Sequence, residues 1–110
     1  MDEMNLFAFQ LISKAGDSFS MMMEGLENAK AGNIVEAKKL MKDAKDTLNE
    51  AHKIHTELLV KEAQGETITY SPILVHAQDH MTKASLADIF INEQINLYQI
   101  IFEMKEGKVV

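Results

Sequence analysis

The 110-residue chain has no cysteine, no tryptophan, one proline and five glycines. Without cysteine there is no disulfide framework, no thiolate nucleophile and no zinc site with cysteine ligands. The shortage of proline and glycine argues against a turn-rich β fold, and 46% hydrophobic residues with eight methionines favour helices. We therefore predict an all-α protein, with residues 1–110 forming a single domain.

Arginine is also absent, and seventeen acidic residues outnumber eleven lysines, for a net charge of −6. Binding to a nucleic-acid backbone or an anionic membrane needs clustered positive charge, so this balance argues against both. The chain starts with the acidic segment Met1-Asp2-Glu3, where a secretion signal would be basic. No apolar run approaches the ~18 residues that span a bilayer. These features predict a cytoplasmic protein.

Apolar residues recur with a seven-residue period in three long segments, which predicts three helices that pack against one another. The repeat contains Ala8, Ala15, Met22 and Ala29 in the first segment, and Ile34, Met41, Leu48 and His55 in the second. The alanines would let neighbouring helices approach closely.

Residues with known capping preferences predict where these helices begin and end. Gly32 is expected to end the first helix, and Asn33 with Glu36 resembles a capping box that opens the second. The second helix is expected to end near Gln64, and Ser71-Pro72 to supply the N-cap and first residue of the third. Because the first connection is only one or two residues long, the first two helices should be antiparallel neighbours.

The third helix carries apolar residues on more than one face. Its repeat contains two series, which are His76, Lys83, Phe90, Leu97 and Met104, and Asp79, Leu86, Glu93 and Ile100. Further apolar residues lie between these series, so we expect this helix to be buried on more than one side. Three helices from one chain cannot easily cover it, which predicts a partner or self-association.

All four histidines lie in two short clusters, each with helical spacing. His52 and His55 are three residues apart, and His76 and His80 are four residues apart with Asp79 between them. A metal could be held where His52 and His55 meet Asp79 and His80. A phosphoryl relay needs one nucleophilic imidazole, and His76 lies near the start of a helix, where added negative charge is favoured. Hydrogen-bonded histidines without chemistry are a third interpretation, and the spacing leaves all three open.

An acidic residue in the third helix is unusual for a packed position. Asp79 belongs to one of the two seven-residue series, and a buried carboxylate is costly unless it is paired. If self-association gathers several copies of Asp79 on a symmetry axis, their repulsion demands a cation or protonation.

The segment Val75-His76-Ala77-Gln78-Asp79-His80 resembles the signature of the enzyme IIA component of the bacterial sugar phosphotransferase system, lactose/cellobiose/diacetylchitobiose family. Further matches in order and spacing are Ala51-His52, Thr56, Glu62-Ala63, Gly65, Ala29-Lys30-x-Gly32 and Glu93-x-Ile95-x-Leu97. The resemblance thus covers nearly the whole chain. Three places differ from the family pattern: His55 replaces a glutamine, Ser18-Phe19 replaces Ala-Arg, and Met81-Thr82 replaces Leu-Met.

This resemblance implies an up-down-up antiparallel three-helix subunit that assembles into a parallel homotrimer, a bundle of nine helices. His76 would accept a phosphoryl group from the histidine-containing phosphocarrier protein and pass it to the cysteine of a IIB component. The phosphoryl group would then reach a disaccharide of the cellobiose, lactose or chitobiose type entering through the membrane IIC permease. Asp79 and its symmetry copies would hold a divalent ion, expected to be Mg²⁺, on the trimer axis. Gln78 and His80 would support the phosphoryl group.

The alternative is a non-enzymatic metal-binding or adaptor bundle. Its site would consist of His52, His55, Asp79 and His80, and His76 would be incidental. The sequence leaves the sugar and the IIB partner open, because by this resemblance a IIA component never touches the sugar.

Overall fold

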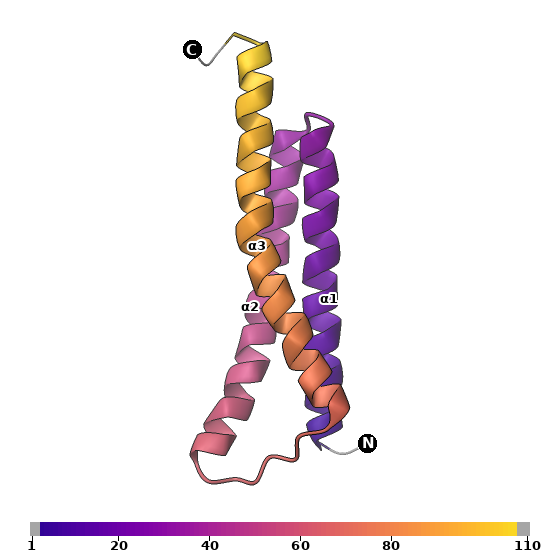
Figure 1. Cartoon of the computed structure of the whole chain (residues 1–110), viewed down its shortest axis with the longest axis vertical. Helices are drawn as coiled ribbons and strands as arrows, with labels where there is room; N and C mark the ends of the chain where they lie inside the picture. The colour runs from indigo at the N-terminus through magenta and orange to yellow at the C-terminus, as the bar shows by residue number, and fades with distance from the viewer. Residues whose placement is uncertain (1–2, 108–110) are drawn as a thin grey trace.

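The computed structural model describes residues 3–107, which form three long α-helices and, within that range, no strand. They are α1 (Glu3–Lys30), α2 (Ile34–Ala63) and α3 (Pro72–Lys105), and they run up, down and up along an elongated bundle with extents of 60 × 23 × 18 Å (Figure 1). The predicted all-α, up-down-up fold is confirmed. None of the helices in this range is both long and apolar enough to cross a membrane. The acidic start of the chain includes Met1 and Asp2, which lie outside the described residues.

The predicted C-terminal end of α1 and the predicted start of α3 are confirmed by backbone geometry and capping. Gly32 has a φ of +90°, a left-handed conformation that suits glycine, and Asn33 N donates to Asn28 O at 2.8 Å across the turn. Ser71 has the extended backbone of an N-cap, and its hydroxyl accepts a hydrogen bond from Leu74 N at 3.2 Å. Pro72 follows at the first helical position, where the missing N–H costs nothing.

The predicted capping box at the start of α2 is wrong. The backbone of Asn33 has φ −85° and ψ 67° rather than the extended conformation of a typical cap, and its side chain makes no capping hydrogen bond. The tight turn after Gly32 fixes this backbone, and the side-chain amide of Asn33 lies 3.5 Å from the side-chain oxygen of Asn28 instead. The α1–α2 turn therefore depends on backbone hydrogen bonds.

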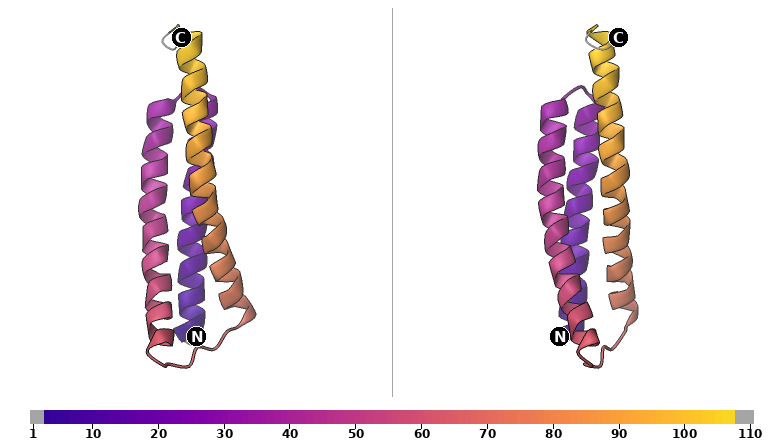
Figure 2. Two further views of the ribbon diagram at one scale, coloured as in Figure 1. Left: turned by 60° about the vertical axis from the view of Figure 1, so that its left-hand side comes forward. Right: turned by 90° about the vertical axis from the view of Figure 1, so that its left-hand side faces the viewer.

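Helix α1 packs along both other helices, whereas α2 and α3 diverge toward the loop 64–71 that joins them (Figures 1 and 2). Two groups of buried residues fill the bundle. One lies nearer the α1–α2 turn, and the other lies nearer the opposite end, where α2 and α3 diverge. Fully buried alanines such as Ala15, Ala44 and Ala77 let the helices approach closely. The buried Ser18 hydroxyl donates to Ala44 O at 2.7 Å and links α1 to α2.

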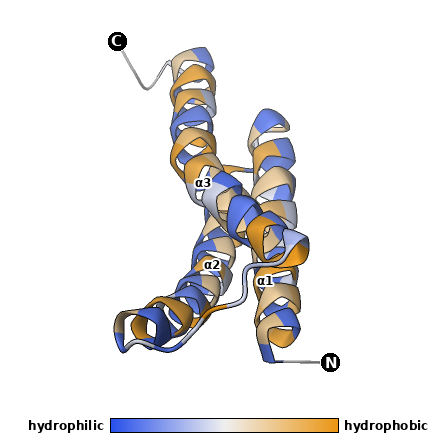
Figure 3. Ribbon diagram, turned by 60° about the horizontal axis from the view of Figure 1, so that its bottom comes forward, coloured by the Kyte–Doolittle hydropathy of each residue, from blue (hydrophilic) through white to orange (hydrophobic). Residues whose placement is uncertain are grey.

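Helix α3 has two faces with different environments. Its buried residues follow a heptad of their own, which is Leu74, Ala77, Met81, Ala84, Asp88, Ile91 and Ile95. The two series predicted from the sequence lie on the opposite side, which we call the outer seam: His76, Asp79, Lys83, Leu86, Phe90, Glu93, Leu97, Ile100 and Met104. Within one chain the apolar residues of the outer seam are exposed, with Phe90 at 60% and Leu97 at 57%. Figure 3 shows hydrophobic and hydrophilic residues alternating along the ribbon of α3. A single chain thus leaves one apolar side of α3 uncovered.

Candidate functional site

His76 lies at the surface in the first turns of α3, at the end of the bundle where α2 and α3 diverge. The Ser71 cap and Pro72 start the helix, and His76 follows one turn later with an exposed side chain. The backbone N–H groups at a helix start carry partial positive charge, so a phosphoryl group near His76 is favoured there. The predicted position of His76 near the start of the third helix is confirmed.

His80 lies directly against His76. Their Nε2 atoms are 3.0 Å apart, and the rings meet edge to face with centroids 4.4 Å apart. Two unprotonated nitrogens would repel at this distance, so one ring donates its proton to the other. His80 is half-buried and His76 is exposed, so His80 is the more fixed of the two rings. This geometry orients the imidazole of His76.

Asp79 is paired within its own helix. Lys83 Nζ lies 2.8 Å from Asp79 Oδ2, and both side chains are more than half exposed in the single chain. The hydrogen bond from Lys83 holds the pKa of Asp79 below its ordinary value; burial opposes this shift, and the charges of Lys83, His76 and His80 add to it. Asp79 is therefore an anion with its own cation beside it.

Gln78 faces α2 rather than the histidine pair. Its Nε2 donates to Nε2 of His55, 3.3 Å away. Burial, followed by the charge of nearby His52, lowers the pKa of His55, so its ring is neutral and can accept this bond. Gln78 and His55 thus fasten the first turns of α3 to α2. The sequence identified Gln78 through its motif but gave no signal for this partner.

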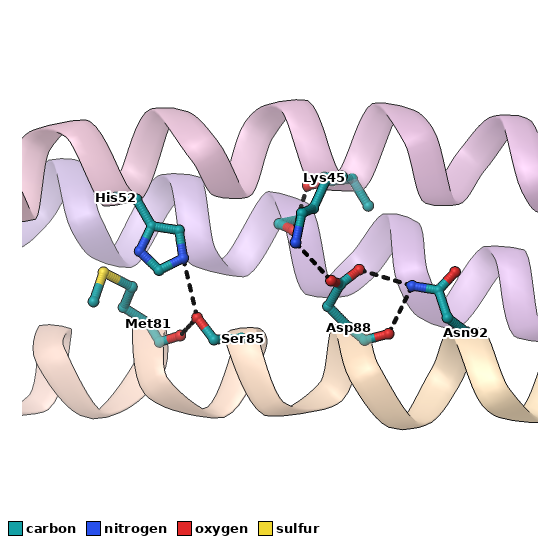
Figure 4. Close-up of polar contacts among 8 residues, drawn as sticks. Lys45, His52, Met81, Ser85, Asp88 and Asn92 are labelled. Atoms are coloured by element: carbon teal, nitrogen blue, oxygen red, sulfur yellow. Dashed lines mark hydrogen bonds and ion pairs between the residues drawn. The ribbon is translucent and has the colours of Figure 1, made fainter.

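His52 makes a second link between α2 and α3 (Figure 4). Ser85 Oγ donates its proton to Met81 O at 2.9 Å and lies 3.3 Å from His52 Nε2. Because the hydroxyl proton is already used, His52 must be the donor in the second contact. His52 therefore has a structural partner.

Asp88 forms a polar link further along the same two helices, and the sequence analysis missed it. The carboxylate is 9% exposed, binds Lys45 Nζ at 2.9 Å and accepts from Asn92 Nδ2 at 3.0 Å (Figure 4). The seven-residue spacing of Asp88 from both Met81 and Ile95 is the sequence signal that indicates its packed position. A buried acid in the heptad of the core needs such partners, and here they set the register of α3 against α2.

The four residues of the alternative metal site each have a different neighbour in this structure. They are His52 with Ser85, His55 with Gln78, Asp79 with Lys83, and His80 with His76. Across residues 3–107 there is no group of three or more histidine, cysteine, aspartate or glutamate side chains placed to hold a metal ion. The alternative prediction of a metal site from these four residues is therefore wrong for the single chain.

Comparison with known proteins gives matches along nearly the whole chain. The family model described as "PTS system, Lactose/Cellobiose specific IIA subunit" matches residues 6–99. A lactose-specific EIIA component of Staphylococcus epidermidis is 37% identical over 89% of this chain and 94% of that protein. A lichenan-specific phosphotransferase enzyme IIA component of Bacillus subtilis is also 37% identical, over 98% of each chain.

Solved structures agree with the sequence matches. The cellobiose-specific enzyme IIA from Bacillus anthracis superposes with a TM-score of 0.90 at 40% identity, over 92% of this chain and 93% of that one. The IIA(chitobiose) chain from a complex with HPr of Escherichia coli superposes with a TM-score of 0.79 at 33% identity, over 92% of this chain and 98% of that one. The similarity in fold and in sequence thus extends over the part of α3 that carries the histidine pair.

Proposed function

Because the chain belongs to the lactose/cellobiose-specific IIA family of the sugar phosphotransferase system, we propose that it carries a phosphoryl group on His76. The observation that supports this most is the geometry of that imidazole, which is exposed one turn into α3 with its Nε2 3.0 Å from His80 Nε2. A carrier needs an accessible nucleophile that two partners can reach in turn, and little more than correct positioning.

The proposed transfer has two steps, to His76 and then from His76, and each is an in-line displacement at phosphorus. The lone pair of a neutral His76 nitrogen attacks the phosphorus of the donor phosphohistidine, and the donor N–P bond breaks as the new N–P bond forms. The donor imidazole leaves with the electron pair of the broken bond. In the second step a cysteine thiolate of the acceptor attacks the same phosphorus, and His76 recovers its lone pair.

We assign His80 the role of holding His76 in the reactive tautomer. If His80 Nε2–H donates across the 3.0 Å contact, the lone pair of His76 is on Nε2 and its proton is on Nδ1, and this hydrogen bond opens as Nε2 attacks phosphorus. After transfer to Nε2, the same N–H can donate to a phosphoryl oxygen. Gln78 supports the site indirectly, because its bond to His55 fixes the start of α3.

The proposed donor is the histidine-containing phosphocarrier protein, HPr, with which the related IIA(chitobiose) was solved in complex. The proposed acceptor is the cysteine of a IIB component, which hands the phosphoryl group to a lactose- or cellobiose-type sugar at the membrane IIC component. Val75, beside His76, is 55% exposed and gives the site an apolar rim. One rim can serve two successive partners, since transient complexes need only modest interfaces. The cytoplasmic location of these steps stays a prediction.

We further propose that three chains associate through the outer seam of α3 as a parallel homotrimer. The exposed Leu86, Phe90 and Leu97 on this seam support the proposal, because monomers rarely expose so continuous an apolar stripe. Parallel association would place three copies of Asp79 in one layer. The resemblance implies Mg²⁺ with these carboxylates as its ligands, an expectation that the ammonium group of Lys83 beside Asp79 does not favour.

The proposal is tested by phosphoryl acceptance from phosphoenolpyruvate, enzyme I and HPr, followed by intact mass. His76→Ala should accept nothing while keeping the helical content of the native chain. His52→Ala is the matched control, since it removes an exposed histidine of α2 and should accept the phosphoryl group like the native chain. Acceptance by His76→Ala would refute the assignment.

A further inference from the structure

Two opposite charges lie side by side among the apolar residues of the outer seam. Asp79 and Lys83 are both seam residues, and their carboxylate and ammonium groups are 2.8 Å apart. From this contact we propose that Lys83 supplies the counter-charge for Asp79, so that the α3 helices assemble without a divalent ion. The inference rests on the homotrimer proposed above.

The backbone of α3 explains why the two groups meet. Residues four apart on a helix are separated by about 6 Å along the axis and lie on one face. Helical side chains lean toward the N-terminus, so the long Lys83 side chain reaches back over Asp79. An acid followed by a base four residues later is also the more favourable order. The core heptad of α3 lies on the opposite side, so both charges point away from α1 and α2.

In a parallel trimer this pair would make the charged part of the seam neutral. Three copies of Asp79 would form one layer, and three copies of Lys83 would lie about one turn further along the axis. Each carboxylate would bring its own ammonium group, so the repulsion among the carboxylates is offset within each chain. The other acid of the seam, Glu93, is about 15 Å beyond Lys83 along the helix axis, too far to pair with it.

A divalent ion does not fit Asp79 well in this chain. Lys83 Nζ already holds Asp79 Oδ2, and an ion on the other carboxylate oxygen would add positive charge beside the lysine ammonium groups. Each chain offers one carboxylate there, and across residues 3–107 Asp79 belongs to no group of three or more histidine, cysteine, aspartate or glutamate side chains placed to hold a metal ion. Lys83 thus occupies the place that the sequence prediction gave to Mg²⁺.

The proposal is tested by the concentration at which the trimer half-dissociates, measured by analytical ultracentrifugation of the full chain over a dilution series. For the native chain this concentration should differ by less than about twofold between EDTA and millimolar MgCl₂. For Lys83→Met in EDTA it should rise by about tenfold or more, because the carboxylates lose their counter-charge. Lys42→Met is the matched control, because it breaks a similar pair with Asp46 away from the seam and should behave like the native chain.

Three results would overturn the inference while leaving the trimer in place. The first is a native trimer that dissociates in EDTA, which would assign the counter-charge to a metal ion. The second is a Lys83→Met variant that assembles like the native chain in EDTA. The third is weaker assembly of the double variant Asp79→Leu with Lys83→Leu, which should assemble at least as tightly as the native chain. A native chain that is monomeric at every concentration would overturn the trimer itself, and phosphoryl acceptance would show whether the carrier assignment survives.

Discussion

Replacing Leu97 with alanine should weaken self-association while leaving the fold of each chain intact. Leu97 lies on the outer seam, is 57% exposed in the single chain and is separate from the core heptad of α3. The substitution therefore removes few contacts from the monomer. In the proposed trimer it removes three leucine side chains from the interface.

The size of the effect follows from the exposed part of the side chain. Full burial of a leucine contributes about 1.5–3 kcal/mol, so covering the exposed half contributes about 1 kcal/mol per chain. Three chains then lose about 3 kcal/mol, which is about 100-fold in the trimer dissociation constant. Because that constant scales with the square of the monomer concentration at the midpoint, half-dissociation should occur at about tenfold higher concentration.

Sedimentation equilibrium over a dilution series measures this midpoint. Leu59→Ala is the matched control, since it removes the same atoms from a half-exposed leucine of α2 away from the seam. The control should shift the midpoint by less than about twofold. Equal shifts for the two variants would show that the outer seam is not the interface, and the reasoning would fail.

Three further predictions concern stability, each measured by urea unfolding. Asp88→Ala removes a buried acceptor of two side-chain hydrogen bonds and should lower the free energy of unfolding by about 1–3 kcal/mol. Its control, Asp46→Ala, breaks an exposed ion pair and should change the free energy of unfolding by less than about 1 kcal/mol. Ser71→Ala removes the hydroxyl that caps α3 and should cost about 1 kcal/mol. Burial, and then the charge of His52, lowers the pKa of His55 in the folded chain below its ordinary value of 6.5. The unfolded chain therefore binds a proton at His55 more readily than the folded chain does. As a result, the free energy of unfolding falls as the pH drops from 6.5 through the lower pKa of the folded chain. His55→Gln should flatten this loss.

Each of these predictions has a clear contrary result. A loss for Asp88→Ala no larger than that for Asp46→Ala would show that the buried carboxylate is not stabilising. An unchanged free energy of unfolding for Ser71→Ala would show that backbone and loop contacts suffice to start α3. An unchanged pH dependence in His55→Gln would assign the acid sensitivity to another histidine.

The helices could be predicted because their ends depend on local chemistry. Gly32 and Ser71 act through backbone conformation and a hydroxyl, and both appear directly in the sequence. Asn33 misled the prediction because the turn before it fixes a backbone angle unsuited to capping. Residue preference alone does not contain that constraint.

The faces of α3 could not be assigned from the sequence, because two heptads overlap in it. Periodicity shows that both are apolar, but it does not show which one packs inside the same chain. The buried heptad contains alanines and Asp88, which made it look less like a core than the outer seam. The choice depends on the shape that α1 and α2 present, which exists only in the folded bundle.

The signature residues of the site were predictable and their partners less so. His76 and His80 are four residues apart, so their contact follows from helical geometry. The bond between Gln78 and His55 joins two helices and depends on how they are aligned. Lys83 follows Asp79 by four residues, so helical spacing allows their pair, but spacing alone does not distinguish a lysine partner from a metal ion.

The most direct test of the central claim is the intact mass of the native chain after incubation with phosphoenolpyruvate, enzyme I and HPr, measured before and after mild acid. The account predicts a gain equal to one phosphoryl group per chain that acid removes, because a phosphohistidine N–P bond is acid-labile. The His76→Ala variant should show no gain in the same experiment. No gain in the native chain, with HPr shown to be active on another acceptor, would contradict the account.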